Sequence, residues 1–366
     1  MKKIGILGRS GGDPERGKVL INMGRMLKEN FHLDLIVNSK EINPCAKDFY
    51  NIKNYVKFDI KYSTYIKLFL NDLINLYKYC KKEKPDRIFQ YTCPYIQGPV
   101  VALIGRLTKT FCITRFSGAT FEFYKSKKRI KDKILAYLTL KWYMRLMFLA
   151  NKVIVLGESQ KSEAIKNGCK SEKILILPQP IDELNFYPAK SKSEAKKKLG
   201  IPTNKTVILW VGNLQDYKGI DSLKNLIICA DKSKKDFLFL IVGKDFNNTS
   251  EKLRKASKIV RIEGVIPNTE MVKYYQAADL LIHTSYIEAS VPNTIWEALA
   301  CGTPAIGRDI RDIKKVADAV FRTDEELIDI VLCKNWKSST HSKVPEEYAW
   351  NNLKNKYISV FNRGDL

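Results

Sequence analysis

Short apolar runs alternate with longer amphipathic stretches along nearly the whole chain. The first half contains runs at residues 3–7, 33–37, 87–91, 111–116, 152–156 and 173–178. The second half contains runs at residues 206–212, 237–243, 258–264 and 279–284. Continuous apolar strands between helices are typical of parallel sheets that helices cover on both faces. The pattern therefore predicts an α/β protein with one doubly wound, Rossmann-like sheet in each half.

A polar stretch rich in proline and lysine, "PQPIDELNFYPAKSKSEAKKKLGIPTNK", lies between the two halves. Such composition is typical of a boundary between domains. We expect a first domain over residues 1–180, a linker over 181–205 and a second domain from residue 206 to 345. Parallel sheets bind ligands at the carboxyl ends of their strands, so two facing domains would place a ligand cleft between them.

The charge and cysteine content of the chain indicate which classes of partner it binds and in which cellular compartment it lies. Lys and Arg outnumber Asp and Glu by 63 to 39, a net charge of +24, which favours anionic partners such as phosphates, nucleic acid or a lipid surface. The eight cysteines form no C-x-x-C pair, as expected of free thiols in a reducing cytoplasm. The start "MKKIGILGRSGG" lacks the apolar length of a signal peptide, so we expect a soluble or peripheral protein in the cytoplasm.

Two glycine turns follow predicted strands. Gly11 and Gly12 follow the first strand and precede a helical stretch, which permits close approach of an anion to the backbone. The second turn, "WVGNLQDYKGIDSL", carries Lys218, which could neutralise a diphosphate and stabilise it as a leaving group. Neither turn has a G-x-G-x-x-G or P-loop pattern. A simple tight turn and a solvated lysine remain the alternatives.

An acidic segment, "TSYIEASVPNTIWEALACGTPAI", brackets a Pro-Asn-Thr turn with Glu288 and Glu297. The helix that follows would begin with unpaired N–H groups, which attract phosphate. The carboxylates suit the hydroxyls of a ribose and of a sugar on either side of that phosphate, so a nucleotide sugar is the candidate ligand. The alternative is an acidic helix start that only complements the helix dipole.

The chain resembles a family 4 retaining glycosyltransferase of the GT-B fold. Four segments in order carry the likeness: "ANKVIVLGESQKSEAIKNGCKSEKILILPQPIDELNFYP", "VGNLQDYKGID", "IEASVPNTIWEALACGTPAI" and "EEYAWNNLKNKYISVF". The resemblance implies that residues 1–180 lie on the acceptor side, that 206–345 bind the nucleotide sugar, and that a helix over 346–366 returns to the first domain.

By the same resemblance, a sugar moves with retention from a nucleoside-diphosphate donor to a glycan or lipid-linked acceptor, a hexosyltransferase-type reaction of surface polysaccharide or glycolipid synthesis. Lys218 and Glu288 are the implied catalytic residues, with Lys218 on the diphosphate and Glu288 facing the transferred sugar. The implied binding residues are Asn213, Val265, Asn293, Thr294, Glu297, Gly11, Gly12, Ser117 and Gly118. Glu297 would bind the ribose, and Val265 would line the base.

The sequence departs from the family pattern at two points. Asn213 stands where arginine is common, so another cation, Arg308 or Arg16, is a candidate for the missing charge. Eight residues separate Glu288 from Glu297, where the family usually has seven. No D-x-D motif occurs, and the three histidines show no metal-ligand spacing, so no obligatory metal or other cofactor is expected. A structural role is favoured for each histidine, including His283.

Two other functions remain open. Asn213 and the longer acidic segment also fit a catalytically silent relative that binds a nucleotide sugar. The high positive charge alone would fit nucleic-acid binding, but no recognisable module accompanies it, so no nucleic-acid partner is expected.

A basic run joined to an apolar helical stretch, "KSKKRIKDKILAYLTLKWYMRLMFLA", predicts contact with an anionic membrane surface from the inner face. Its basic face would include Lys133, Lys141 and Arg145, while Leu138, Trp142, Leu146 and Leu149 supply apolar area. The alternative is an interior helix of the first domain with a solvated basic edge.

Overall fold

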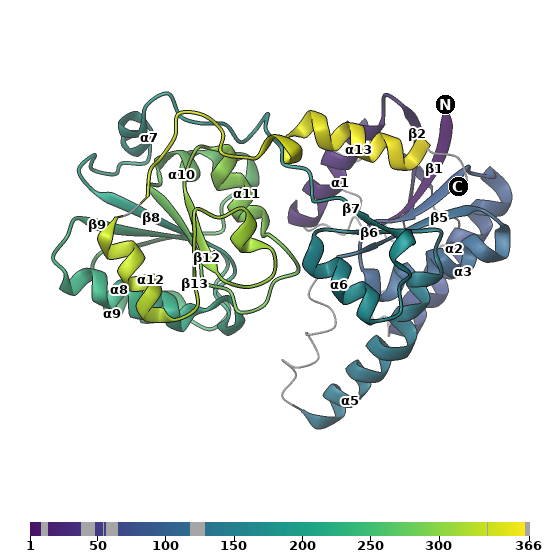
Figure 1. Cartoon of the computed structure of the whole chain (residues 1–366), viewed down its shortest axis with the longest axis horizontal. Helices are drawn as coiled ribbons and strands as arrows, with labels where there is room; N and C mark the ends of the chain where they lie inside the picture. The colour runs from purple at the N-terminus through teal and green to yellow at the C-terminus, as the bar shows by residue number, and fades with distance from the viewer. Residues whose placement is uncertain are drawn as a thin grey trace. The chain divides into compact units, whose positions relative to one another are not determined.

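The computed structural model describes residues 1–8, 14–37, 48–53, 55, 65–117, 129–334 and 336–362. The chain divides into two compact units, which are described separately. The first unit consists of Met1–Pro180 and Trp350–Leu366, and the second of Ile181–Ala349. Each is built around one sheet with helices packed against it (Figure 1).

The first unit contains a sheet with the strand order β3-β2-β1-β4-β5-β6-β7 over its described residues. Its strands are β1 (Lys2–Leu7), β2 (Phe31–Ile36), β3 (Asn51–Lys53), β4 (Arg87–Gln90), β5 (Phe111–Phe116), β6 (Lys152–Val155) and β7 (Ile174–Ile176). Its helices are α1 (Pro14–Leu27), α2 (Tyr65–Glu83), α3 (Pro94–Thr108), α5 (Ile130–Leu138), α6 (Glu158–Lys166) and α13 (Trp350–Asn362). The described strand pairs are all parallel, as the apolar runs predict.

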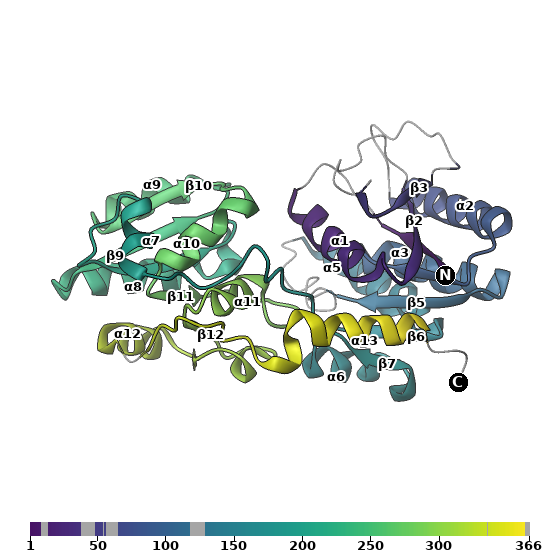
Figure 2. The ribbon, with the colours of Figure 1, turned by 90° about the horizontal axis from the view of Figure 1, so that it is seen from above.

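The C-terminal helix α13 is part of the first unit. It lies against α1, as both views show in yellow (Figures 1 and 2). Phe361 packs edge to face on Phe89, with ring centroids 5.3 Å apart, and Tyr357 donates a hydrogen bond to the carbonyl of Pro178. Leu353, Tyr357 and Phe361 are fully buried, so this helix completes the core on one face of the sheet.

The second unit contains a sheet with the strand order β10-β9-β8-β11-β12-β13, again with parallel pairs. Its strands are β8 (Thr206–Val211), β9 (Phe237–Val242), β10 (Val260–Gly264), β11 (Leu280–His283), β12 (Ala305–Arg308) and β13 (Ala319–Phe321). Its helices are α7 (Lys192–Lys198), α8 (Ile220–Lys232), α9 (Thr249–Ala256), α10 (Met271–Ala277), α11 (Asn293–Ala300) and α12 (Asp324–Cys333).

Successive side chains of β8 enter different cores. Val207 and Leu209 pack with residues of α10 and α11, whereas Ile208 and Trp210 pack with residues of α8 and α12. Because side chains alternate across a strand, helices must cover both faces of this sheet. The second unit is therefore doubly wound.

The segment expected as a linker, residues 181–205, folds within the second unit. Ile181, Phe186 and Ile201 are buried in its core, and Lys196 forms an ion pair with Asp279 at 2.7 Å. Ser191 caps α7 by accepting a hydrogen bond from the backbone N–H of Glu194. This segment, whose proline and lysine content suggests a linker, is therefore packed and capped as part of the second unit.

The chain of the second unit changes direction across its sheet between β8 and β11. It runs from β8 outward to β10, then returns to β11 and continues to β13. Ligands of open α/β sheets bind at such a switch point, outside the carboxyl ends of the two strands. The loops after β8 and β11 are therefore the place to look for the site.

Candidate functional site

Lys218 stands on the loop that follows β8. A 3₁₀ turn over Asp216–Lys218 ends at Gly219, whose φ is 72°. A Cβ atom at Gly219 would lie 2.1 Å from the carbonyl oxygen of Thr284, just after β11. Thr284 in turn donates its hydroxyl to the carbonyl of Lys218. Glycine is required here by both conformation and space, and it lets the lysine loop press against the end of β11.

Glu288 lies on the loop after β11, where its carboxylate contacts the side chains of Lys218 and His283. The Lys218 Nζ is 2.6 Å from its Oε1, and the His283 Nε2 is 3.1 Å from the same oxygen. The side chains of Lys218 and Glu288 are 20% and 15% exposed, so the pair is largely shielded but still reachable from solvent. The predicted catalytic pair therefore meets at the switch point of the second sheet.

The environment of Glu288 keeps it ionised. Burial alone would raise the pKa of its carboxyl, but the hydrogen bond and charge of His283 and those of Lys218 outweigh burial and lower the pKa to about 2. A carboxylate at neutral pH fits a role as acceptor for sugar hydroxyls and as a partner that positions Lys218.

His283, for which the sequence favours a structural role, lies beside Glu288 in the structure. It ends β11, is 5% exposed, and contacts Glu288 rather than only filling the core. The available signal was its place at the carboxyl end of a strand, five residues before a candidate catalytic glutamate. The predicted structural role of His283 stays a prediction, and the structure adds that its partner is the candidate catalytic Glu288.

Arg308, a candidate for the charge absent at Asn213, is already engaged in contacts within the second unit. Its guanidinium donates to the Ser222 hydroxyl and to the carbonyls of Thr284 and Arg322, and it lies 4.4 Å from the centroid of the Tyr286 ring. The Arg308 side chain is only 9% exposed, and these contacts hold loops of the second unit together. The side chain of the other candidate, Arg16, lies outside the described residues.

Arg311, which the sequence did not single out, approaches Glu288 from another side. Its Nε donates to the backbone carbonyl of Glu288 at 3.2 Å. It follows β12, the neighbour of β11, and takes a left-handed conformation with φ 54°. Glu288 therefore lies between a lysine on its carboxylate and an arginine on its backbone.

Helix α11 begins at Asn293 without a side-chain cap. Thr294 follows, and its buried Oγ1 has no hydrogen-bond partner among the described residues. A helix start of this kind offers backbone N–H groups and a positive dipole end to an anion. Asn293 and Thr294 therefore lie where the sequence predicts a phosphate, on the chain segment that directly follows Glu288.

Glu297 lies one turn further along α11. It is 6% exposed, and its Oε2 accepts a hydrogen bond from the Tyr275 hydroxyl at 2.7 Å. That bond fixes one carboxylate oxygen against α10. Its predicted role as ribose acceptor stays a prediction.

The remaining predicted residues are spread over both units. Asn213 lies in the Lys218 loop, where its carbonyl accepts the N–H of Gln215. Val265 follows β10, two strands from β8, with its side chain 69% exposed. In the first unit, Ser117 directly follows β5, at the carboxyl edge of that sheet. Gly11, Gly12 and Gly118 lie outside the described residues.

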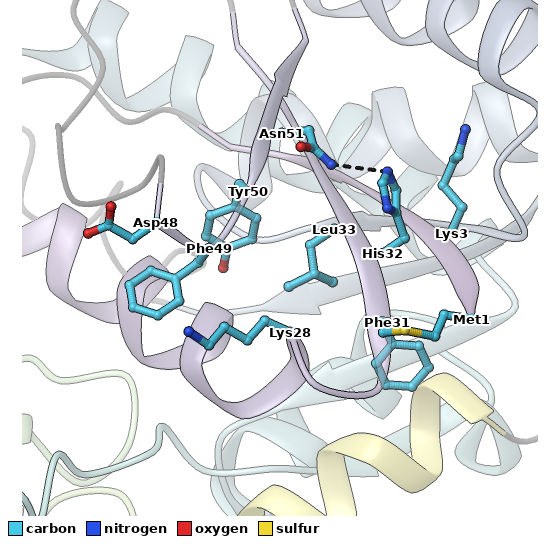
Figure 3. A pocket seen from close by; sticks show the side chains of 10 residues that line it. All are labelled: Met1, Lys3, Lys28, Phe31, His32, Leu33, Asp48, Phe49, Tyr50 and Asn51. Carbon is cyan, nitrogen blue, oxygen red and sulfur yellow. Dashed lines mark hydrogen bonds between the residues drawn. The ribbon is translucent and has the colours of Figure 1, made fainter.

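A hollow of about 660 Å³ in the first unit contains none of the predicted site residues (Figure 3). It is lined by Met1, Phe31 and Asn51, which lie at the starts of β1, β2 and β3, and His32 contacts Asn51 there. This is the amino edge of the sheet, opposite the edge where ligands of parallel sheets bind. The hollow is therefore not part of the candidate site.

A family model matches the segment that contains Lys218, Glu288 and Glu297. Residues 191–321 match the family model of glycosyl transferases group 1. A D-inositol 3-phosphate glycosyltransferase of Segniliparus rotundus is 28% identical over 47% of this chain and 39% of its own. The chain thus spans about two fifths of the length of such curated relatives. A UDP-Gal:alpha-D-GlcNAc-diphosphoundecaprenol alpha-1,3-galactosyltransferase of Escherichia coli is 26% identical over 74% of each chain.

Solved structures resemble the whole chain. The sucrose-phosphate synthase of Thermosynechococcus elongatus has a TM-score of 0.77 at 16% identity, covering 99% of this chain and 98% of its own. Anabaena Alr3699/HepE, solved in complex with UDP and glucose, has a TM-score of 0.73 at 14% identity over 99% of both chains. Residues 191–321 are thus similar to the glycosyl transferases group 1, and the fold of the chain is the GT-B fold.

Proposed function

We propose that this protein is a retaining, hexosyltransferase-type glycosyltransferase that uses a nucleoside-diphosphate sugar. The observation that carries the proposal is the contact between Lys218 and Glu288 at the switch point, on the segment that leads into the uncapped start of α11. The cation and the helix start suit a diphosphate, and the carboxylate suits a sugar.

In the proposed reaction the bond between the sugar carbon and the diphosphate oxygen breaks, and its electron pair stays on the diphosphate. Lys218 and the first N–H groups of α11 stabilise that developing negative charge. The acceptor hydroxyl oxygen bonds to the same carbon with retention, and its proton passes to the departing diphosphate oxygen. Glu288 orients Lys218 and accepts hydroxyls of the transferred sugar.

The acceptor class is proposed from relatives. The names of matching proteins include a putative teichuronic acid biosynthesis glycosyltransferase of Bacillus subtilis and an alpha-monoglucosyldiacylglycerol synthase of Acholeplasma laidlawii. We propose a glycan or lipid-linked acceptor in surface polysaccharide or glycolipid synthesis, in the cytoplasm and at an anionic membrane face. No metal and no other cofactor is proposed to be obligatory.

The test combines a panel of nucleoside-diphosphate sugars with glycan and lipid-linked acceptors. Release of nucleoside diphosphate reports turnover, and NMR of the product reports the anomeric configuration. An α-linked product from an α-linked donor is expected, and an inverted product contradicts retention. Tight binding of a donor without any release, for every acceptor, would select the catalytically silent relative instead.

A further inference from the structure

Helix α5 exposes an apolar face. Figure 1 shows it extending from the remainder of the first unit. Ile130 is 74% exposed, Ile134 55%, Tyr137 42% and Leu138 48%. At about 100° per residue these four positions fall within one stripe along the helix. Their exposure is contrary to an interior helix of the first domain.

Trp142 extends the apolar surface beyond the end of α5. It lies in a π-helical turn, Thr139–Tyr143, and is 68% exposed. A 3₁₀ turn, Met144–Leu149, follows and buries Met144 and Met147. The single continuous helix expected from the sequence is therefore wrong, and the apolar surface ends near Trp142.

Basic side chains flank the apolar stripe. Lys131 lies along one edge of it, and Arg129 and Lys133 lie along the other; all three are exposed. Lys141 places its ammonium 5.2 Å from the centroid of the Tyr137 ring. The long stems of lysine and arginine let their charges reach headgroups while the stripe enters the apolar boundary.

Helix α2 repeats this arrangement. Leu70, Ile74 and Tyr77 are exposed at helical spacing, and Lys81 lies 5.8 Å from the centroid of the Tyr77 ring. Phe69 of α2 packs edge to face on Tyr143, in the π-helical turn after α5, with ring centroids 5.6 Å apart. This contact joins α2 to the turn that carries Trp142.

We propose that these rows on α2 and α5 form one docking surface for an anionic lipid membrane. Exposed apolar area on α5 and Trp142, on the order of 500 Å², is comparable to the largest apolar patch of a typical monomer, which is often functional. Tryptophan and tyrosine favour the bilayer interface, and the flanking basic residues complement anionic headgroups. No described helix is long and apolar enough to cross a membrane. The inference does not depend on the proposed transfer reaction, because lipid binding requires no donor.

The test is flotation of the full chain with vesicles of phosphatidylcholine containing about 30% phosphatidylglycerol. We expect binding that high salt weakens and that pure phosphatidylcholine does not support. Ile134→Ser with Trp142→Ser should weaken partitioning at least about 10-fold by removing the apolar insertion. Reversal of Arg129, Lys131 and Lys133 to Glu should weaken it about 100-fold, since each basic residue near anionic lipid contributes about a factor of five.

A matched control uses α6 of the same unit, where Ile165 is 43% exposed. Ile165→Ser with Lys166→Glu should bind vesicles like the wild type, and circular dichroism melting confirms that each variant folds. Absence of vesicle binding by the wild type overturns the proposal, as does equal binding by the α5 variants. A dimer in sedimentation that Trp142→Ser dissociates, without lipid binding, would assign the surface to a second copy and also overturn it.

Discussion

Replacing Glu288 with glutamine tests the electrostatics of the site by a stability measurement that needs no substrate. The pKa of Glu288 falls from 4.5 to about 2 in the folded protein because His283 and Lys218 outweigh the effect of burial. Each pKa unit corresponds to about 1.4 kcal/mol, so ionisation of Glu288 stabilises the fold by about 3 kcal/mol at neutral pH. We expect Glu288→Gln to lower the free energy of unfolding by about this amount.

The pH dependence has a definite sign. The folded pKa lies below the unfolded value, so this stabilisation is fully present above about pH 4.5 and is lost as pH falls toward about pH 2. The difference between wild type and variant should therefore shrink by about 1 kcal/mol between about pH 7 and about pH 3.5. Urea unfolding at both pH values measures it.

Two further variants isolate the cause. Lys218→Met and His283→Gln each remove one partner of Glu288, so the cost of Glu288→Gln should be smaller in either background. Glu325→Gln, on the exposed first turn of α12, is the matched control and should change stability little. A cost for Glu288→Gln that equals this control, or that is unaffected by loss of Lys218 and His283, would refute the proposed coupling.

Three other predictions concern the same site. Lys218→Ala should lower turnover at least about 100-fold, because it removes the positive charge that stabilises the leaving diphosphate. Lys224→Ala, exposed on α8, is the control and should not lower turnover. Equal rates for the two variants would exclude Lys218 from catalysis. Glu297→Gln should weaken nucleoside-diphosphate binding by about 1.5 to 3 kcal/mol if the carboxylate accepts ribose hydroxyls, and calorimetry that finds wild-type affinity removes that role. Gly219→Ala should destabilise the fold by about 2 kcal/mol or more, because the new Cβ would meet the Thr284 carbonyl. Gly200→Ala is its control. Gly200 also has positive φ, but no atom of the described residues lies within 4 Å of an added Cβ, so chemical denaturation should show only about 1 kcal/mol of strain there. Equal costs for the two variants would contradict the close-approach argument.

Much of the fold could be predicted from the apolar runs. Each of the ten runs overlaps a strand of the structure, because buried parallel strands leave a continuous apolar pattern. The runs miss β3, β12 and β13, although they include β7, which is as short. The helix predicted over the basic and apolar stretch was correct at α5 but extended too far, since packing of Met144 and Met147 is not visible in local spacing.

The candidate site was predicted less completely. Lys218 and Glu288 could be named because their segments resemble known motifs, and they meet in the structure. Arg308 was a reasonable candidate cation by charge alone, but its hydrogen bond to Ser222 joins residues 86 positions apart, which no local pattern reveals. Arg311 was missed for the same reason, because its relation to Glu288 arises only when the loops after β11 and β12 come together.

The central claim is that the Lys218–Glu288 pair and the start of α11 bind the diphosphate of a nucleotide sugar. The most direct measurement is calorimetric binding of a panel of nucleoside-diphosphate sugars to the wild type and to Lys218→Ala. At least one donor should bind the wild type, and its affinity should fall at least about 10-fold when Lys218 loses its charge. Failure of every donor to bind the wild type, or equal affinity for the variant, would contradict the claim.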